Sequence, residues 1–243
     1  LKSNIKFAFD GEEEIGSPTL EHILAANRDV LAADVWLMCD GPVYQTRQPL
    51  ILFGARGTTT LDITVYGPRG ELHSGHYGNW APNPALSLAR LLASMKDEAG
   101  GVAIGGFYDE VEPLTDVEKQ AIAEAPVIDK ELMDEFWLGS TDGAPRTLNE
   151  LITVPSLNVR GISSARTGAQ ASNVIPASAS ATLDIRMVKG MTVARTQQQV
   201  LAHIRDQGFF VVDREPDAEV RRSHAKVAKV TFARGSAASR TPM

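Results

Sequence analysis

The chain has 243 residues, of which 43% are hydrophobic and 22% charged, a composition typical of a globular protein with one large domain or two modest ones. Its formal net charge of −6 argues against a nucleic-acid partner and against an anionic membrane surface. No apolar run is long enough to cross a membrane, and the one cysteine, Cys39, excludes an internal disulfide and predicts a reducing cytoplasmic location.

The first forty residues predict a strand, a helix and a second strand. Residues 5–9 are apolar and β-prone, and residues 35–39 form a similar run. Between them, residues 18–33 predict a helix with Ser17 as its N-cap and Pro18 in its first turn. Short links between such elements indicate a parallel βαβ unit, and ligands bind such sheets at the carboxyl ends of their strands.

Carboxylates gather at those two strand ends. Glu12, Glu13 and Glu14 follow the first strand, and Asp40 follows the second. Adjacent carboxylates repel one another, which raises the pKa of one of them unless a cation is near. The cluster therefore suits a divalent metal beside a general base, or alternatively a solvated helix N-terminus favoured by the helix dipole. A calcium site is disfavoured because Asp10-Gly-Glu-Glu-Glu lacks the spacing of a calcium loop.

The rest of the chain predicts a second domain. Three alternating strands, two amphipathic helices and a short final strand follow in the order strand, helix, strand, strand, helix, strand; they cover residues 58–66, 84–96, 157–160, 179–188, 192–205 and 209–212. This order is the split βαβ pattern of a ferredoxin-like domain.

The predicted domain boundaries follow from these elements. Residues 1–56 form part of a first domain, and residues 57–214 form the second domain with an insertion at 100–150. Residues 215–243 return to the first domain, with Val227, Val230 and Phe232 on an amphipathic helix.

Several short motifs together resemble one family. In order they are Asp10-Gly-Glu-Glu-Glu-Ile-Gly-Ser17, Cys39-Asp40-Gly41, Glu71-Leu72-His73-Ser74-Gly75, Asn83-Pro84, Asn173-Val174-Ile175-Pro176 and Asp184-Ile185-Arg186-Met187. The series resembles the aminoacylase, carboxypeptidase G and carnosine-dipeptidase family of co-catalytic zinc peptidases, and most closely its dipeptidase branch. The resemblance implies an α/β fold: a partial doubly wound catalytic domain with an inserted α+β ferredoxin-like lid and dimerisation domain.

The resemblance also implies roles for the acidic residues. Counting back from Gly16-Ser17, Glu13 matches the general base and Glu14 a metal ligand, although the run of three glutamates leaves a shift by one residue open. Asp40 matches the carboxylate on the other metal. A complete site of this family holds two Zn²⁺ ions, and Mn²⁺ or Co²⁺ are alternatives.

Three further residues match positions of the lid. His73 resembles the histidine that reaches across a homodimer to stabilise an oxyanion in the partner's site, against the alternative of a structural or surface histidine. Arg186 resembles the arginine that holds the substrate carboxylate, and a surface strand charge is its alternative. Asn173 resembles a substrate-facing asparagine.

Part of the family's ligand set has no match in these 243 residues. The family has a His-x-Asp motif and a bridging aspartate, expected before Leu1, and a final metal histidine, expected after Met243. We therefore expect a segment of a longer metal-dependent hydrolase that cleaves a peptide or amide bond in a dipeptide or an N-acyl amino acid. By itself the chain is expected to bind zinc weakly and to be inactive. The alternative from another class is a non-catalytic interaction module that dimerises through a helix and an edge strand.

Overall fold

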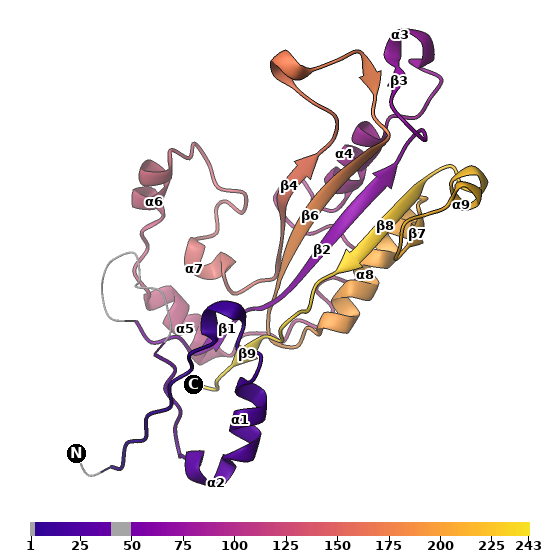
Figure 1. Cartoon of the computed structure of the whole chain (residues 1–243). Helices are drawn as coiled ribbons and strands as arrows, with labels where there is room; N and C mark the ends of the chain where they lie inside the picture. Colours follow the sequence, from indigo (N-terminus) through magenta and orange to yellow (C-terminus); the bar gives the residue numbers. More distant parts are fainter. Residues whose placement is uncertain (1–2, 40–49) are drawn as a thin grey trace. The chain divides into compact units, whose positions relative to one another are not determined.

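The computed structural model describes residues 3–39 and 50–243, which divide into two compact units, 1–50 and 51–243 (Figure 1). In the described part of the chain, no helix is both long and apolar enough to cross a membrane.

The first unit contains a 3₁₀ turn, η1 (Glu13–Ile15), and two short helices, α1 (Leu20–Ala26) and α2 (Arg28–Leu31). The single helix predicted over 18–33 is therefore wrong. It is interrupted at Asn27, whose side-chain amide donates to the carbonyl of Ile23 at 2.8 Å and competes with the helical pattern. The predicted cap is also wrong, because Ser17 has a left-handed φ of 48° and Thr19 precedes the helix instead.

The two strands predicted over 5–9 and 35–39 are absent from the described residues of this unit. Both segments are irregular and exposed: Phe9 is 94% and Met38 88% exposed. An apolar run becomes a strand only when a neighbouring strand takes its backbone hydrogen bonds, and a parallel sheet also needs both of its faces covered. No such partner pairs with these runs within residues 3–39.

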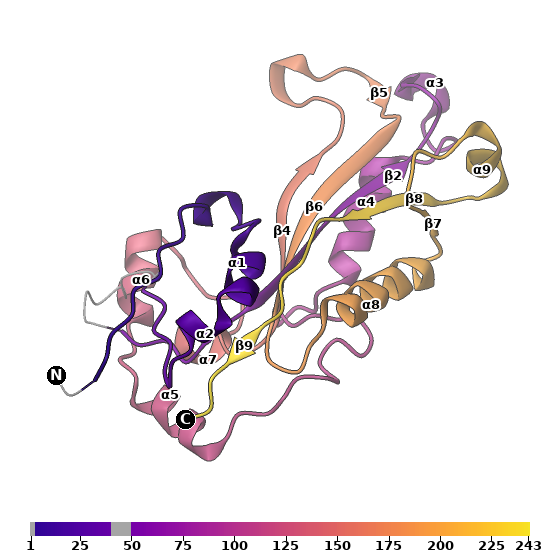
Figure 2. The same cartoon turned by 60° about the horizontal axis from the view of Figure 1, so that its bottom comes forward.

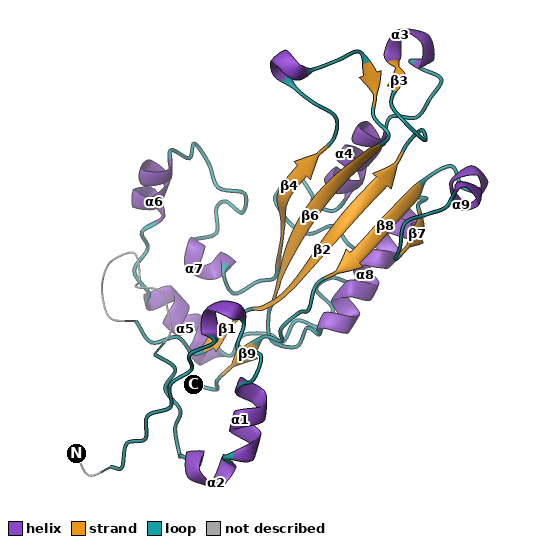
Figure 3. Ribbon diagram, in the orientation of Figure 1, coloured by secondary structure: helices purple, strands orange, loops and turns teal. Residues whose placement is uncertain are grey.

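The second unit is built on a five-stranded sheet in the order β4-β6-β2-β8-β7 (Figure 3). In chain order its strands are β2 (Gly57–Tyr66), β4 (Ser156–Ser163), β6 (Ser178–Met187), β7 (Phe210–Val212) and β8 (Val227–Phe232). All neighbours are antiparallel except β7 and β8. The strands β4, β6, β2 and β8 have the order of a ferredoxin-like sheet, although the sequence assigns the place of β8 to residues 209–212.

The last part of the chain differs from its prediction. The strand that follows α8 along the chain, β7, forms the edge of the sheet, and β8 takes the place beside β2. Val227, Val230 and Phe232 therefore lie on a strand of the lid sheet, and the helix predicted to return them to the catalytic domain is wrong. Their apolar period also fits a strand, since Val230 and Phe232 are two residues apart.

Two helices cover one face of the sheet, α4 (Pro84–Ser94) and α8 (Val193–Asp206) (Figure 2). The Asn83 side chain accepts from two backbone N–H groups at the start of α4, and the Thr192 hydroxyl accepts from one, that of Arg195, at the start of α8. Every second residue of β2 faces these helices and is buried: Leu61, Ile63 and Val65. The other face of the sheet is polar and carries the alternate residues Thr58, Thr60, Asp62, Thr64, Ser180, Thr182, Asp184 and Arg186.

The remaining elements are short. They are β1 (Gly54–Ala55), β3 (Leu72–His73), α3 (Ser74–Tyr77), α5 (Asp116–Glu124), α6 (Asp129–Phe136), α7 (Leu148–Leu151), η2 (Gly168–Gln170), β5 (Val174–Ile175), α9 (Ala218–Ser223) and β9 (Ser239–Arg240). Within the predicted insertion 100–150, the helices α5 and α7 each begin with a capping box. The first part of that segment, however, buries Val102, Ile104 and Phe107 in the core of the lid.

Candidate functional site

The acidic loop of the first unit uses two of its four carboxylates for its own structure. Asp10 accepts from the Ser17 hydroxyl at 2.5 Å and from the Glu12 N–H at 2.9 Å. Glu12 in turn accepts from the Thr19 N–H at 3.2 Å and from the Thr19 hydroxyl. The Ser17 hydroxyl, and to a lesser extent the Glu12 N–H, lowers the pKa of Asp10.

Glu13 and Glu14 are left exposed on the single turn of η1. The turn ends at Gly16, whose φ of 83° is left-handed and whose N–H donates to the carbonyl of Glu13. No side-chain hydrogen bond or ion pair to either glutamate occurs within residues 3–39 and 50–243. The loop therefore displays the two glutamates that the sequence predicts to be functional and holds them by their backbone.

A metal site is not complete in the described residues. Nowhere in residues 3–39 and 50–243 do three or more His, Cys, Asp or Glu side chains come together in a way that could hold a metal ion. Asp40, the other predicted ligand, lies outside the described residues. Since a two-metal centre needs several ligands for each ion, these residues do not by themselves fit one.

The structure brings His73 and Asn173 together. His73 on β3 pairs with Val174 on β5, and the Ser74 N–H donates to the carbonyl of Asn173 at 2.8 Å. The exposed His73 ring accepts from the Gly75 N–H through Nδ1 at 3.1 Å. Because Nδ1 accepts a hydrogen bond, the neutral ring carries its proton on Nε2. Nε2 is therefore available as a donor.

Arg186 lies on β6 of the five-stranded sheet, whereas β3 and β5 form a two-stranded sheet of their own. Arg186 is opposite Thr58 on β2, whereas Ser178, at the other end of β6, is opposite Tyr66. Eight residues of strand separate Ser178 from Arg186, which corresponds to about 26 Å. The structure thus places His73 and Asn173 at one end of the lid and Arg186 at the other.

Arg56 is not among the residues that the sequence predicts to be functional. It directly precedes β2, and its even position in the alternation of Thr58, Thr60 and Asp62 was the available signal. Burial lowers the pKa of Arg56 and the neighbouring charge of Arg186 lowers it further, while Asp184 opposes both effects. Arg56 and Arg186 therefore lie near each other, with a carboxylate beside them.

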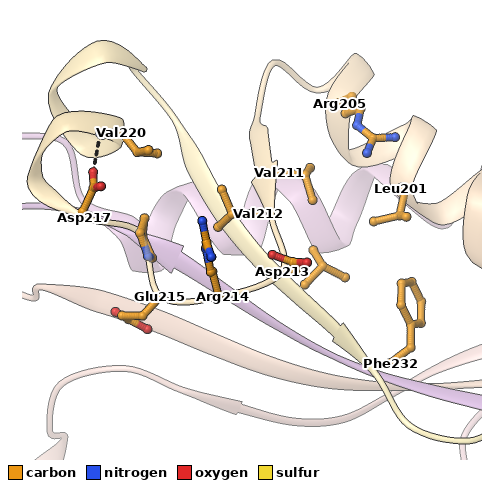
Figure 4. A pocket seen from close by; sticks show the side chains of 12 residues that line it. Leu201, Arg205, Val211, Val212, Asp213, Arg214, Glu215, Asp217, Val220 and Phe232 are labelled. Atoms are coloured by element: carbon orange, nitrogen blue, oxygen red, sulfur yellow. Dashed lines mark hydrogen bonds between the residues drawn. The ribbon is translucent and has the colours of Figure 1, made fainter.

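A hollow of about 540 Å³ lies elsewhere on the lid, among α8, β7, β8 and α9 (Figure 4). Its lining combines apolar side chains, including Leu201, Val211 and Phe232, with charged ones such as Arg205 and Asp213. None of the residues predicted to be functional lines it.

Comparisons with known proteins identify the second unit. The family pattern described as "Peptidase dimerisation domain" matches residues 53–209. The chain belongs to the M20 peptidase family. The resemblance stated from the motifs is thereby confirmed.

Two curated relatives of this M20 chain are named as dipeptidases. The human Beta-Ala-His dipeptidase is 31% identical over 214 residues, which cover 85% of this chain and 41% of the human protein. The Cys-Gly metallodipeptidase dug1 of Schizosaccharomyces pombe is 29% identical over 205 residues, or 83% of this chain and 43% of the yeast protein. The chain thus spans less than half the length of these relatives.

Solved structures agree with the fold. An M20 family metallo-carboxypeptidase, Sso-CP2 from Sulfolobus solfataricus, matches with a TM-score of 0.70 and 28% identity over 82% of this chain and 46% of its own. Human carnosine dipeptidase 1 matches with a TM-score of 0.69 and 24% identity over 96% of this chain and 48% of its own. The mixed α/β architecture with an M20 dimerisation domain is therefore shown.

Proposed function

We propose that this M20 chain is part of a metal-dependent hydrolase that cleaves the peptide or amide bond of a dipeptide or an N-acyl amino acid. The observation that carries the proposal is the Asp10–Ser17 loop. Two of its carboxylates hold the loop together, which leaves Glu13 and Glu14 exposed and without side-chain partners in the described residues. The relatives named Beta-Ala-His dipeptidase and Cys-Gly metallodipeptidase support the substrate class.

In this proposal Glu13 takes a proton from the attacking water and delivers it to the leaving amine. Glu14 and Asp40 contribute to the metal sites, which in a complete centre hold two Zn²⁺ ions, or Mn²⁺ or Co²⁺. The metals would polarise the substrate carbonyl and make the water more acidic. The described residues lack a full ligand set, so the proposed activity belongs to a protein in which further ligands join them.

His73 and Arg186 are proposed to act on substrate from two different protomers. A dipeptide is at most about 7 Å long, whereas about 26 Å of strand separates the two ends of the lid at which these residues lie. One chain therefore cannot use both residues on one dipeptide. We propose that Arg186 holds the substrate carboxylate, and that Nε2 of the partner's His73 donates to the oxyanion, with the partner's Asn173 beside it.

The dimer is proposed to form along β4. This strand pairs only with β6 in the described part of the chain, so its outer edge is open over eight residues. Val159 and Ile162 on β4 are exposed, and an open apolar edge is a template for pairing with another strand. The same edge favours the second candidate function, a dimerising module without catalysis.

Metal content, turnover and mass separate the two candidates. The chain is incubated with zinc, its bound metal is counted and its mass in solution is measured, and Beta-Ala-His serves as the test substrate. Both candidates expect the isolated chain to be a dimer without turnover, so the decision comes from a longer protein that contains this chain together with further metal ligands. Bound zinc with turnover in that protein supports the hydrolase, and a dimer with neither supports the module. Two zinc ions per protomer with turnover in the isolated chain would contradict the expectation that it is incomplete.

The assignment of Glu13 is tested in any active protein that contains this chain. Glu13→Gln should abolish turnover and leave the metal bound, because the base is lost and the ligand stays. Loss of metal in Glu13→Gln, but not in Glu14→Gln, would show that the register is shifted by one residue.

The cytoplasmic location stays a prediction that cell fractionation can check.

A further inference from the structure

Two arginines and one aspartate form a cluster on the polar face of the lid sheet. Thr58 is opposite Arg186 and Thr60 is opposite Asp184, so these four side chains share the face of the sheet opposite to α4 and α8. Arg56 lies two residues before Thr58 and follows the same alternation, which makes it a diagonal neighbour of Arg186. We call Arg56, Asp184 and Arg186 the arginine cluster.

Asp184 fixes one side of the Arg186 guanidinium. Its Oδ2 accepts from Nε of Arg186 at 3.0 Å, and its Oδ1 accepts from the Thr58 hydroxyl at 3.3 Å. The Asp184 side chain is only 15% exposed, so loss of its partners would be costly and the pair is held in place. The side chain of Arg186 is 46% exposed.

The donors that point away from Asp184 have no partner. In residues 3–39 and 50–243, neither the Nη groups of Arg186 nor the guanidinium of Arg56 makes a hydrogen bond or an ion pair with another side chain or carbonyl. Arg56 is thus close enough to Arg186 and Asp184 for their charges to act on it, and Asp184 is the one carboxylate of the cluster. The cluster has a net charge of +1.

We propose that Arg56 is a second substrate-binding residue, which shares the substrate carboxylate with Arg186, and that Asp184 is the positioning residue that aims the Arg186 fork. The substrate class rests on the function proposed above, but the binding of a carboxylate does not. A carboxylate has about four lone-pair directions, enough for one bidentate arginine and a second donor. The negative charge of the ligand also relieves the repulsion between the two guanidinium groups.

The electrostatics of Arg56 agree with this arrangement. Its pKa is lowered by burial first and by Arg186 second, as expected for a cation placed beside another cation. An anion that binds between them reverses the second effect.

The test is a titration of the whole 243-residue chain with N-acetylglycine, followed by NMR of the arginine Nε–H signals. N-acetylglycinamide, which has no carboxylate, is the control ligand. We expect the signals of Arg56 and Arg186 to shift with N-acetylglycine only. Either variant, Arg56→Gln or Arg186→Gln, should weaken binding by about tenfold, since each removes a charge-assisted contact. Arg69→Gln, at an exposed turn beyond the far end of β2, is the matched control and should bind like the unmodified chain.

Asp184 is tested by a signal that a purely structural role would not move. In Asp184→Ala the Nε–H of Arg186 should lose its ordered relaxation while the chain stays folded, and Asp184→Asn, which keeps an acceptor oxygen, should restore it. Asp62→Ala removes another carboxylate from the same face and should leave Arg186 unchanged.

The outcomes separate this proposal from the proposed function. Undiminished binding of N-acetylglycine by Arg56→Gln overturns the role of Arg56, whether or not any protein with this chain hydrolyses dipeptides. An unchanged Nε–H signal in Asp184→Ala overturns the positioning role. Absence of hydrolysis together with carboxylate binding that depends on Arg56 would count against the proposed function alone.

Discussion

Phe9 in the first unit and Ile63 in the second both lie in segments that the sequence predicts to be strands, yet Phe9 is 94% exposed and Ile63 is 0% exposed. Ile63 belongs to β2, which has β6 on one side and β8 on the other. Phe9 has no strand beside it in the described residues. The difference shows that neighbouring strands, and not the apolar run itself, decide whether a segment is buried.

The two units also differ in the range of their contacts. In the acidic loop of the first unit, Asp10 and Glu12 bond to groups at most seven residues away. In the second unit the Tyr66 hydroxyl donates to Glu215 at 2.7 Å across 149 residues. Local contacts define the shape of a loop, whereas long-range contacts make a sheet cooperative.

The largest loss of stability is expected from a substitution at the centre of the five-stranded sheet. Leu183 on β6 is fully buried, so Leu183→Ala should lower the free energy of unfolding by about 2–5 kcal/mol through lost burial and a cavity. Leu37→Ala is the matched change in the first unit, where Leu37 is 77% exposed, and it should alter stability by less than about 0.5 kcal/mol. Urea unfolding followed by circular dichroism measures both. A similar loss in the two variants would remove the contrast between the units.

The same contrast between the two units explains which elements the sequence predicts correctly. The strands β2 and β6 and the helices α4 and α8 were predicted correctly because their partners lie within the chain and their alternation or helical period is complete. The runs at 5–9 and 35–39 were predicted as strands from composition alone, and composition contains no information about a missing neighbour. The short period of residues 227–232 was read as helical for a similar reason, since three apolar residues fit either period.

In the candidate site, the motifs predict which residues are functional, but they do not predict how far apart these residues lie. His73, Asn173 and Arg186 were predicted from local sequence, and only the sheet register shows that His73 and Arg186 lie at opposite ends. Arg56 has no motif around it, and only the pairing of β2 with β6 reveals its neighbour. The roles of all these residues stay predictions.

The next largest effect is a dependence of stability on pH, which we expect from a buried histidine of the second unit. His203 on α8 is 9% exposed, and its Nε2 lies 2.9 Å from the Ser94 hydroxyl on α4. Burial lowers the pKa of His203, and Asp206 opposes this only in part. The unfolded chain therefore takes up a proton first as the pH falls below about 6.5, and the free energy of unfolding should fall by at most about 1.4 kcal/mol per pH unit. The loss should stop once the pH is below the folded pKa.

The measurement is urea unfolding at several pH values between neutral and mildly acidic. His203→Gln should flatten the dependence on pH, whereas His22→Gln, at an exposed position of α1, should leave it as it is. A slope that survives in His203→Gln would assign the effect to another group.

A smaller effect is expected at the end of β2. Burial, and then the hydrogen bond and charge of Glu215, raise the pKa of Tyr66 to about 12. A raised pKa means that the stabilisation is present below the unfolded pKa, about 10, and is lost as the pH rises towards the folded value. Ultraviolet titration should show one tyrosine that ionises late. Glu215→Gln should bring its pKa part of the way back, while Glu219→Gln, on the exposed side of α9, should not.

The smallest effect is expected from Asp10, which closes the loop that displays Glu13 and Glu14. The Ser17 hydroxyl and then the Glu12 N–H lower its pKa below the ordinary 3.8, so its contribution is present above that value and is lost as the pH falls through the folded pKa. Asp10→Asn should shift the amide signals of Glu12 and Ser17 in NMR spectra, and Asp29→Asn on α2 should not. Since these contacts are all local, the urea midpoint of the second unit should stay the same in Asp10→Asn. A lower midpoint would mean that the loop and the sheet unfold together, and the contrast between local and long-range contacts would then fail at the residues that matter most for the proposed chemistry.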